Sequence, residues 1–507
     1  MNSLLDVQSL TIKHTNGSDS VLVDNLSFSI GRGEILGCTG FSGSGKSLTA
    51  LSLMGMTSQL SNITQTGKVV FNGALISDFK FNQWQHLRGN KISIVFQHPD
   101  ASFNPLISCI QQLRECIAIH QPQLHQNDID RHLQDLLILT HLDSLQNISH
   151  AYPHELSGGQ LQRLNIAMAI SNKPQLVIAD EPTSSLDVDN ARSITGLLVE
   201  LCRQNDCGLL FISHDLPLLE SVSDRILFID KGKKSGEVST QDFRTGNIST
   251  GLKAYKSYMS ELTVRKKLPE TLPEILRLES VSKRYKSGHK SQDDNTPSDT
   301  LKGISLVVRQ GEMLGIYGSS GSGKTTIAKI ITGLTDADSG ELFLHNNQYM
   351  SSTLDNNREI RRKIQIVFQD ASSSLQPLMR IRNQWEEIIR IYHSKEETEQ
   401  IIQYWLGFTG LDEGVLNKYP HQLSGGQQQR VALIKPLLVR PDVLIFDESM
   451  SALDYYHQHI IIDLIIRMQE ETGFAGIFIS HDMRLLQRIA HRALELKGGT
   501  FVQEVVF

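Results

Sequence analysis

The stretch Gly40-Phe41-Ser42-Gly43-Ser44-Gly45-Lys46-Ser47 matches the phosphate-loop pattern G-x-x-x-x-G-K-[ST]. A strand-like apolar run precedes it at residues 34–39, and a helix-like apolar run follows it at residues 48–54. Between a strand and a helix, glycines let successive backbone N–H groups converge on an anion, and the helix N-terminus adds partial positive charge. The stretch therefore predicts a phosphate site, in which Lys46 reaches the β- and γ-phosphates and Ser47 offers a hydroxyl to Mg²⁺.

The same pattern occurs a second time. In Gly318-Ser319-Ser320-Gly321-Ser322-Gly323-Lys324-Thr325, the lysine stands 278 positions after that of the first loop. Three later landmarks, Leu-Ser-Gly-Gly-Gln, an apolar run ending in Asp-Glu, and Ser-His-Asp, each recur at a constant offset of 267. We therefore predict two copies of one domain, at residues 1–263 and 274–507, joined by an exposed connector at 264–273. Each copy alternates strand-like and helix-like stretches, which predicts an α/β fold with a mainly parallel sheet.

Bulk composition narrows the class of protein. The chain of 507 residues has 39% hydrophobic and 21% charged residues, which is ordinary for a soluble protein with several domains. The formal net charge of −6 argues against general nucleic-acid binding. No long apolar run predicts a membrane span, and the N-terminus lacks the layout of a signal peptide. The five cysteines lack the paired spacing of a zinc or iron–sulfur site, so we interpret them as mostly buried thiols in a reducing cytoplasm.

Two adjacent carboxylates end a strand-like apolar run in each copy. They are Asp180 with Glu181, and Asp447 with Glu448. In parallel sheets, function gathers at the C-terminal ends of the strands. There the aspartate can hold Mg²⁺, and the glutamate can polarise an attacking water as general base. The alternative is a strand that simply ends in a solvated acidic turn. We consider it negligible because the chain also contains two phosphate loops.

Polar residues also end other apolar runs in both copies. His214 and His481 follow one such run, and Gln97 and Gln369 end another. A single histidine or glutamine in this position is more often an ordinary hydrogen-bonded strand end. Their recurrence favours contact of the histidine with the γ-phosphate, and of the glutamine with water or Mg²⁺.

A third element opens a helix-like stretch in each copy, as Ser157-Gly158-Gly159-Gln160 and as Ser424-Gly425-Gly426-Gln427. Serine is a natural N-cap, and the glycines expose backbone N–H groups at the positive helix end. Because each domain already has a phosphate loop, a second anion site implies that it serves another domain's nucleotide. An ordinary capped helix is the simpler alternative.

In these motifs the chain resembles an ATP-binding cassette (ABC) ATPase with both nucleotide-binding domains in one polypeptide. The resemblance covers nearly the whole chain, and it includes a Ser-x-Leu-Asp loop at residues 184–187 and 451–454. It implies tandem P-loop NTPase domains, each with a RecA-like core, an antiparallel β subdomain and a helical subdomain. It also implies ATP and Mg²⁺ as cofactors, ATP hydrolysis as the activity, and an intramolecular head-to-tail dimer of the two domains.

The resemblance assigns roles residue by residue, and it places each ATP between the phosphate loop of one copy and the Ser-Gly-Gly signature of the other. Tyr285 matches the aromatic residue that stacks on adenine, and His14 takes that place less strongly in copy one. The implied nucleotide-binding residues are His14, Gly40, Ser42, Gly43, Ser44, Gly45, Lys46, Ser47, Leu48, Ser157, Gly158, Gly159, Gln160, Tyr285, Gly318, Ser319, Ser320, Gly321, Ser322, Gly323, Lys324, Thr325, Thr326, Ser424, Gly425, Gly426 and Gln427. The implied catalytic residues are Glu181, Glu448, His214, His481, Gln97 and Gln369. The implied metal ligands are Ser47, Gln97, Asp180, Thr325, Gln369 and Asp447.

Copy two departs from the family pattern in two places. Ser449-Met450 stands where copy one has Pro182-Thr183. Pro436 is expected to interrupt the helix after the signature, where a proline costs roughly 3 kcal/mol unless the helix already bends. Both glutamates are present, so we predict two competent sites, although these departures argue against equal turnover.

The segment after each Val-Phe-Gln indicates which kind of ABC protein this is. Ser102-Phe103-Asn104-Pro105 and Ser374-Leu375-Gln376-Pro377 resemble the dipeptide, oligopeptide and nickel importer ATPases, in which this region faces the membrane subunits. The resemblance implies an ATPase that powers import of a small solute, either a peptide or a nickel or metal chelate. Its partners would be two permease subunits and an extracytoplasmic solute-binding protein, and it would sit peripherally on the cytoplasmic face of the inner membrane.

Two alternatives remain open. One is a soluble twin-cassette ABC protein that acts on ribosomes, although such proteins carry a long charged helical arm and the connector here is short. The other is a ribose-type sugar importer ATPase, which typically has a degenerate signature in one copy.

Overall fold

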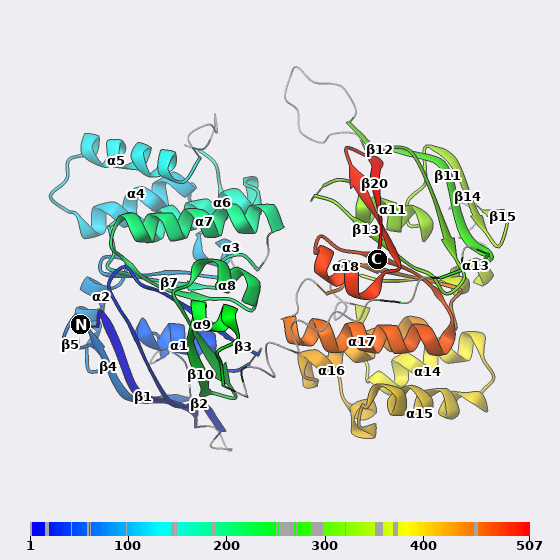
Figure 1. Cartoon of the computed structure of the whole chain (residues 1–507), viewed down its shortest axis with the longest axis horizontal. Coiled ribbons are helices and arrows are strands. Elements are labelled where there is room, and N and C mark those ends of the chain that lie inside the picture. The colour runs from blue at the N-terminus through cyan, green and yellow to red at the C-terminus, as the bar shows by residue number, and fades with distance from the viewer. Residues whose placement is uncertain are drawn as a thin grey trace. The chain divides into compact units, whose positions relative to one another are not determined.

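The computed structural model of the chain describes residues 3–15, 20–41, 43–57, 60, 62–97, 99–142, 148, 150–184, 186, 188–249, 252, 265, 268–269, 271–285, 298–319, 321–349, 358–368, 374–450 and 455–507. The chain divides into two compact units, Met1–Ser260 and Glu261–Phe507. Each unit contains a larger, mainly parallel sheet, a smaller antiparallel sheet and a group of helices (Figure 1). The predicted tandem α/β architecture is therefore confirmed.

The first unit is organised on the sheet β10-β9-β3-β8-β7-β6, in which β10 alone of these strands runs antiparallel to its neighbour. The smaller sheet has the order β2-β1-β4-β5. Strands β3, β7 and β8 are buried along their whole length, which explains why they are continuous apolar runs in the sequence. The strands are β1 (Leu5–His14), β2 (Ser20–Ile30), β3 (Ile35–Gly40), β4 (Ile63–Phe71), β5 (Ala74–Leu75), β6 (Ile92–Val95), β7 (Leu176–Asp180), β8 (Gly208–Ile212), β9 (Arg225–Asp230) and β10 (Lys233–Ser239).

The helices of the first unit include a separate helical group. Helices α4 and α5 lie beside α6 (Figure 1), and the three share an apolar core with members such as Leu113, Leu133 and Leu164. The helices are α1 (Lys46–Leu53), α2 (Phe81–Leu87), α3 (Pro99–Ser102), α4 (Cys109–His120), α5 (Gln126–Leu139), α6 (Gly158–Ile170), α7 (Val188–Gln204), α8 (Leu216–Val222) and α9 (Thr240–Thr245).

The second unit repeats this plan with the sheets β16-β17-β18-β13-β19-β20 and β12-β11-β14-β15. Its strands are β11 (Glu274–Tyr285), β12 (Ser298–Arg309), β13 (Met313–Tyr317), β14 (Ser339–Leu344), β15 (Asn347–Tyr349), β16 (Ile364–Val367), β17 (Val443–Asp447), β18 (Ala475–Ile479), β19 (Arg492–Lys497) and β20 (Thr500–Val506). Its helices are α11 (Lys324–Ile331), α13 (Arg358–Lys363), α14 (Ile381–Tyr392), α15 (Glu397–Thr409), α16 (Gly425–Leu437), α17 (Tyr455–Thr472) and α18 (Met483–Ile489).

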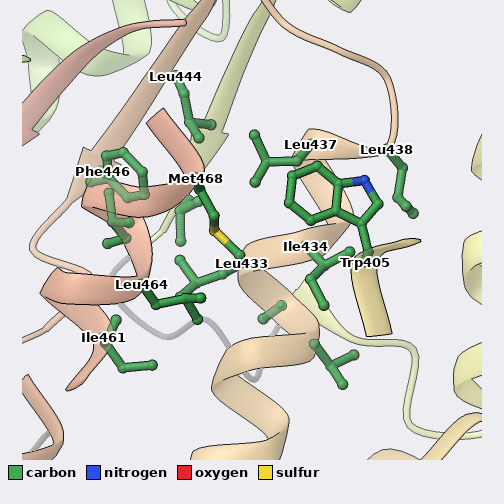
Figure 2. Packing of buried hydrophobic residues seen from close by; sticks show 14 of the residues in the cluster. Trp405, Leu433, Ile434, Leu437, Leu438, Leu444, Phe446, Ile461, Leu464 and Met468 are labelled. Carbon is green, nitrogen blue, oxygen red and sulfur yellow. The ribbon is translucent and has the colours of Figure 1, made fainter. Parts of the chain in front are cut away.

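One core of the second unit joins the signature helix α16 to the strand that ends in the two carboxylates. Figure 2 shows Leu433 and Ile434 of α16 near Met468 of α17, with Phe446 of β17 and Trp405 of α15 in the same cluster. Trp405 is 5% exposed and Phe446 is 1% exposed. Because such interiors are close-packed, a shift of α16 is felt directly at the end of β17.

Helix α16 continues through Pro436, so the expected interruption is wrong. Helices α6 and α16 each span 13 residues. Pro436 is buried one residue before the end of α16, and the amide of Leu438 still donates to the carbonyl of Ile434 at 3.1 Å. The proline removes one hydrogen bond to the preceding turn and crowds a carbonyl there, so the helix continues through Pro436 at some cost in stability.

Within the described part of the chain, no helix is both long enough and apolar enough to cross a bilayer.

Candidate functional site

The two phosphate loops have the backbone that their glycines predict. Gly45 and Gly323 precede α1 and α11 with φ of 94° and 107°, a region that disfavours any residue with a Cβ. A Cβ on Gly40 would lie 2.0 Å from a carbonyl oxygen of β9, and one on Gly318 would lie 2.2 Å from a carbonyl oxygen of β19. Glycine is therefore required at these positions by the turn and by close backbone approach.

The loop lysines fold back over their own loops. The Nζ of Lys46 donates to the carbonyls of Gly40 and Phe41, both at 2.9 Å, and the side chain is 6% exposed. Lys324 makes the same two bonds at 2.8 and 3.0 Å. Phosphate oxygens are stronger partners for an ammonium than carbonyl oxygens, so an incoming phosphate would take over these contacts.

A buried aspartate lies beside the first hydroxyl of each helix. Asp180 is 7% exposed, and within the described residues its Oδ1 has no hydrogen-bond partner. Burial raises the pKa of Asp180, and a hydrogen bond with Ser47 opposes that rise. In the second unit, Thr325 Oγ1 donates to Asp447 Oδ1 at 3.2 Å, and burial again raises the pKa of the carboxyl. A buried carboxylate oxygen that needs a partner, next to a hydroxyl, fits a hard divalent cation such as Mg²⁺.

Each glutamate after these aspartates stands in strained backbone. Glu181 and Glu448 both have φ of 47°, in the left-handed region that glutamate seldom occupies. Such a residue costs on the order of 1 kcal/mol or more and is kept only where its surroundings over-determine it. The amide of Glu181 donates to Ile212 at 2.9 Å, and that of Glu448 donates to Ile479 at 3.1 Å. The same strain in both copies indicates that the turn serves to aim the carboxylate.

The structure brings two predicted residues of the first unit to one carboxylate oxygen of Glu181. Gln97 Nε2 donates to Glu181 Oε2 at 3.1 Å, and His214 Nδ1 lies 3.4 Å from the same oxygen. In the second unit, Glu448 Oε1 instead lies 3.7 Å from the Nζ of Lys324. His481 is half-buried directly after β18, in the place that His214 holds after β8.

The signature segments cap their helices as predicted. Ser157 Oγ accepts from the amide of Gln160 at 3.3 Å, and the Gln160 side chain accepts from the amide of Ser157 at 2.9 Å. Ser424 and Gln427 make the same reciprocal pair at 3.4 and 3.1 Å. Both serines and the first glycine of each motif are exposed. Each helix N-terminus is therefore well defined and open to an external anion.

The two candidate adenine residues end strands that border the phosphate loops. Tyr285 ends β11 and is 41% exposed, with the Nζ of Lys283 lying 5.7 Å from its ring centroid. Strand β12, the partner of β11, borders Gly323, and strand β2, the partner of β1, borders Gly45. His14 ends β1 in the same way. Each candidate residue therefore ends the strand that pairs with the strand bordering its loop.

Some predicted site positions lie outside the described residues, namely Ser42, Ser320, Gln369 and, in the Ser-x-Leu-Asp loops, 185, 187 and 451–454. Sequence reasoning missed two other kinds of residue. One is a pair of loop-holding glutamines, Gln112 and Gln384, which recur at the offset of 272 that also separates Gln97 from Gln369. The other is a pair of buried glutamines, Gln429 and Gln458, which donate to the carbonyls of Ser449 and Met450.

Together, the fold and the site define a P-loop ATPase with two cassettes of one plan in a single chain. The family model described as "ABC transporter" matches residues 23–184 and 301–451. The chain therefore belongs to the ABC transporter family, and it is an ATP hydrolase of that family.

Relatives span almost the whole chain. It is 33% identical over 512 residues to the peptidoglycan transport ATP-binding protein YejF of Agrobacterium fabrum, covering 99% of this chain and 92% of the relative. It is 31% identical over 538 residues to the glutathione import ATP-binding protein GsiA of Pectobacterium atrosepticum, covering 99% and 86%. A solved structure, the dimeric form of the bacterial ABC transporter cassette MJ0796, is 32% identical and covers 46% of this chain and 98% of that chain with a TM-score of 0.39.

Proposed function

We propose that this chain powers import of a small peptide-like solute through two membrane permease subunits that receive the solute from an extracytoplasmic binding protein. Its relatives are named for glutathione, a tripeptide, and for peptidoglycan, which carries short peptides. These names support a peptide over nickel or a metal chelate. The permeases would hold the chain at the cytoplasmic face of the inner membrane.

The observation that carries the proposal is an exposed leucine at the same place in both units. Leu106 is 84% exposed and Leu378 is 90% exposed, and they follow the two Pro residues of the importer-like elements. A large apolar side chain this exposed, and repeated, indicates a contact with another protein. Two equivalent protrusions fit a partner that also comes in two copies or two halves.

A glutamine, half-buried at Gln112 and buried at Gln384, fixes the loop that carries each leucine. Gln112 Nε2 donates to the carbonyls of Asn104 and Ile107 at 3.0 and 2.8 Å, and its Oε1 accepts from the amide of Asn104 at 2.8 Å. Gln384 makes the same three bonds to the loop before α14, at 3.0, 2.8 and 3.0 Å. A loop held in this way loses little conformational entropy when a partner binds, so it is suited to docking.

In the proposed catalytic cycle, ATP lies between the phosphate loop of one unit and the signature of the other. Lys46 and the loop amides bind the phosphates, and Ser424 with the amides behind it closes the site from the other unit. Glu181 takes a proton from the attacking water, and Gln97 and His214 hold that carboxylate in place. Mg²⁺, when bound by the Ser47 and Asp180 oxygens, supplies neutralisation of phosphate charge.

The second site is proposed to use Lys324, Thr325, Asp447, Glu448 and His481 in the same roles, opposite the signature that begins at Ser157. Hydrolysis would open the two units and reset the permeases.

The docking proposal is tested with single substitutions, Leu106→Asp and Leu378→Asp. Each is expected to weaken copurification of the permease subunits with the tagged chain while leaving its own ATP hydrolysis intact, because neither leucine belongs to the nucleotide site. Leu334→Asp is the matched control, since Leu334 is 59% exposed but lies after α11. Copurification of ribosomes without permeases would instead support the soluble twin-cassette alternative.

The solute is identified from the partner binding protein. Mass spectrometry of that protein, purified from cells, is expected to release a short peptide. Recovery of nickel or a metal chelate would overturn the peptide assignment, and recovery of a sugar would support the ribose-type alternative.

A further inference from the structure

The segment after Glu448 keeps its shape without the proline that the first unit has at this point. Pro182 follows Glu181, whereas Ser449 follows Glu448. A proline fixes its own φ and so stiffens the turn. Yet both glutamates have φ of 47°. Something other than a proline ring must therefore hold the strained turn in the second unit.

Two buried glutamines hold that segment by its carbonyls. Gln429 Nε2 donates to the carbonyl of Ser449 at 3.2 Å, and Gln458 Nε2 donates to the carbonyl of Met450 at 3.0 Å. The glutamines are 8% and 9% exposed. Gln429 comes from α16 and Gln458 from α17, so the segment is fastened to two different helices.

The first unit does not have this arrangement. The position 267 residues before Gln458 is Ala191, which has no amide to donate. Gln162 stands 267 residues before Gln429 and is 1% exposed, but within the described residues neither side-chain amide atom has a hydrogen-bond partner. The proline and the pair of amide bonds thus occur in different units.

We propose that Gln458, assisted by Gln429, is a positioning residue for Glu448. It holds the left-handed turn that presents this carboxylate, in place of the missing proline. Ser449 gives no help of its own, since its buried Oγ has no hydrogen-bond partner among the described residues. Loss of the Gln458 amide would leave the Met450 carbonyl buried and unpaired, and would let the strained turn relax. The proposal rests on the role proposed for Glu448 as general base.

The test compares the full chain with Gln458→Met, which keeps the length of the side chain and removes the amide. The kcat of ATP hydrolysis is expected to fall by up to about twofold, because one of two sites is affected, while KM for ATP stays within about twofold. Adding Ser449→Pro is expected to restore kcat, since the first unit shows that this turn accepts a proline after glutamate. Gln162→Met is the matched control and is expected to leave kcat nearly unchanged.

A purely structural role for Gln458 would change the melting temperature and both kinetic constants, and Ser449→Pro would not restore kcat selectively. Either an unchanged kcat in Gln458→Met or a failure of Ser449→Pro to restore it overturns the proposal. If Gln458→Met does not fold alone, the double variant decides: hydrolysis near the wild-type rate supports the proposal, and its absence overturns it. Glu448→Gln is measured in parallel, because undiminished hydrolysis there would overturn the base assignment and not the positioning argument.

Discussion

At the scale of single residues, the sequence predicted the members of the candidate site but not how their side chains are held. The carboxylate pairs could be found because each ends an apolar run. The φ of 47° at Glu181 and Glu448 could not be predicted, because neither residue is a glycine or asparagine, the types that indicate a left-handed turn. The hydrogen bond from Gln97 to Glu181 could not be predicted either, because the two residues are 84 positions apart and come together only through the packing of two strands.

The glutamates carry a prediction at this scale. The double substitution of Glu181→Gln with Glu448→Gln should remove steady-state hydrolysis and retain bound ATP, because glutamine keeps the shape of the side chain but cannot accept the proton. Phosphate release and nucleotide retention after gel filtration measure the two effects. Appreciable turnover in the double variant would contradict the general-base role of both carboxylates.

At the scale of elements, the helix caps and the phosphate-loop strands were predictable, because the rules that govern them are local. The effect of Pro436 was not, because its cost depends on where α16 ends and on the core around it. Contacts between strand ends are equally hidden from the sequence. One of them joins β13 to β19, where His491 Nδ1 accepts from the amide of Met313 at 2.9 Å.

His491 makes the second unit sensitive to acid. Burial, and then the neighbouring Arg265, lower its pKa from 6.5 to about 4, and the negative charge of Glu312 opposes this fall only in part. As the pH falls below 6.5, the unfolded chain binds a proton at His491 that the folded chain does not bind. The contribution of His491 to the free energy of unfolding is therefore present above pH 6.5 and is lost as the pH falls toward about 4. His491→Asn offers an acceptor that does not titrate, and the melting temperature of this variant should fall less across that window. An identical pH profile for both proteins would contradict the assignment.

At the scale of the whole molecule, each unit has a phosphate loop and a separate capped helix N-terminus, and the proposed function uses them in crossed pairs. Ser424→Arg should therefore disturb ATP bound at Lys46, and Ser157→Arg should disturb ATP bound at Lys324. The two variants lose the same kind of cap, so each controls for the other. Photoaffinity labelling with an ATP analogue, followed by peptide mapping, reports the sites separately. Full protection at Lys46 in Ser424→Arg would show that the crossed arrangement is wrong.

The left-handed turn at the two glutamates also limits how this chain can change over generations. Glycine at either position would relieve the backbone strain. Selection for heat tolerance alone is therefore expected to favour glycine there, and to remove the carboxylate that is proposed to serve hydrolysis. Both units have glutamate at φ of 47°, so each carries a cost in backbone strain that glycine would remove.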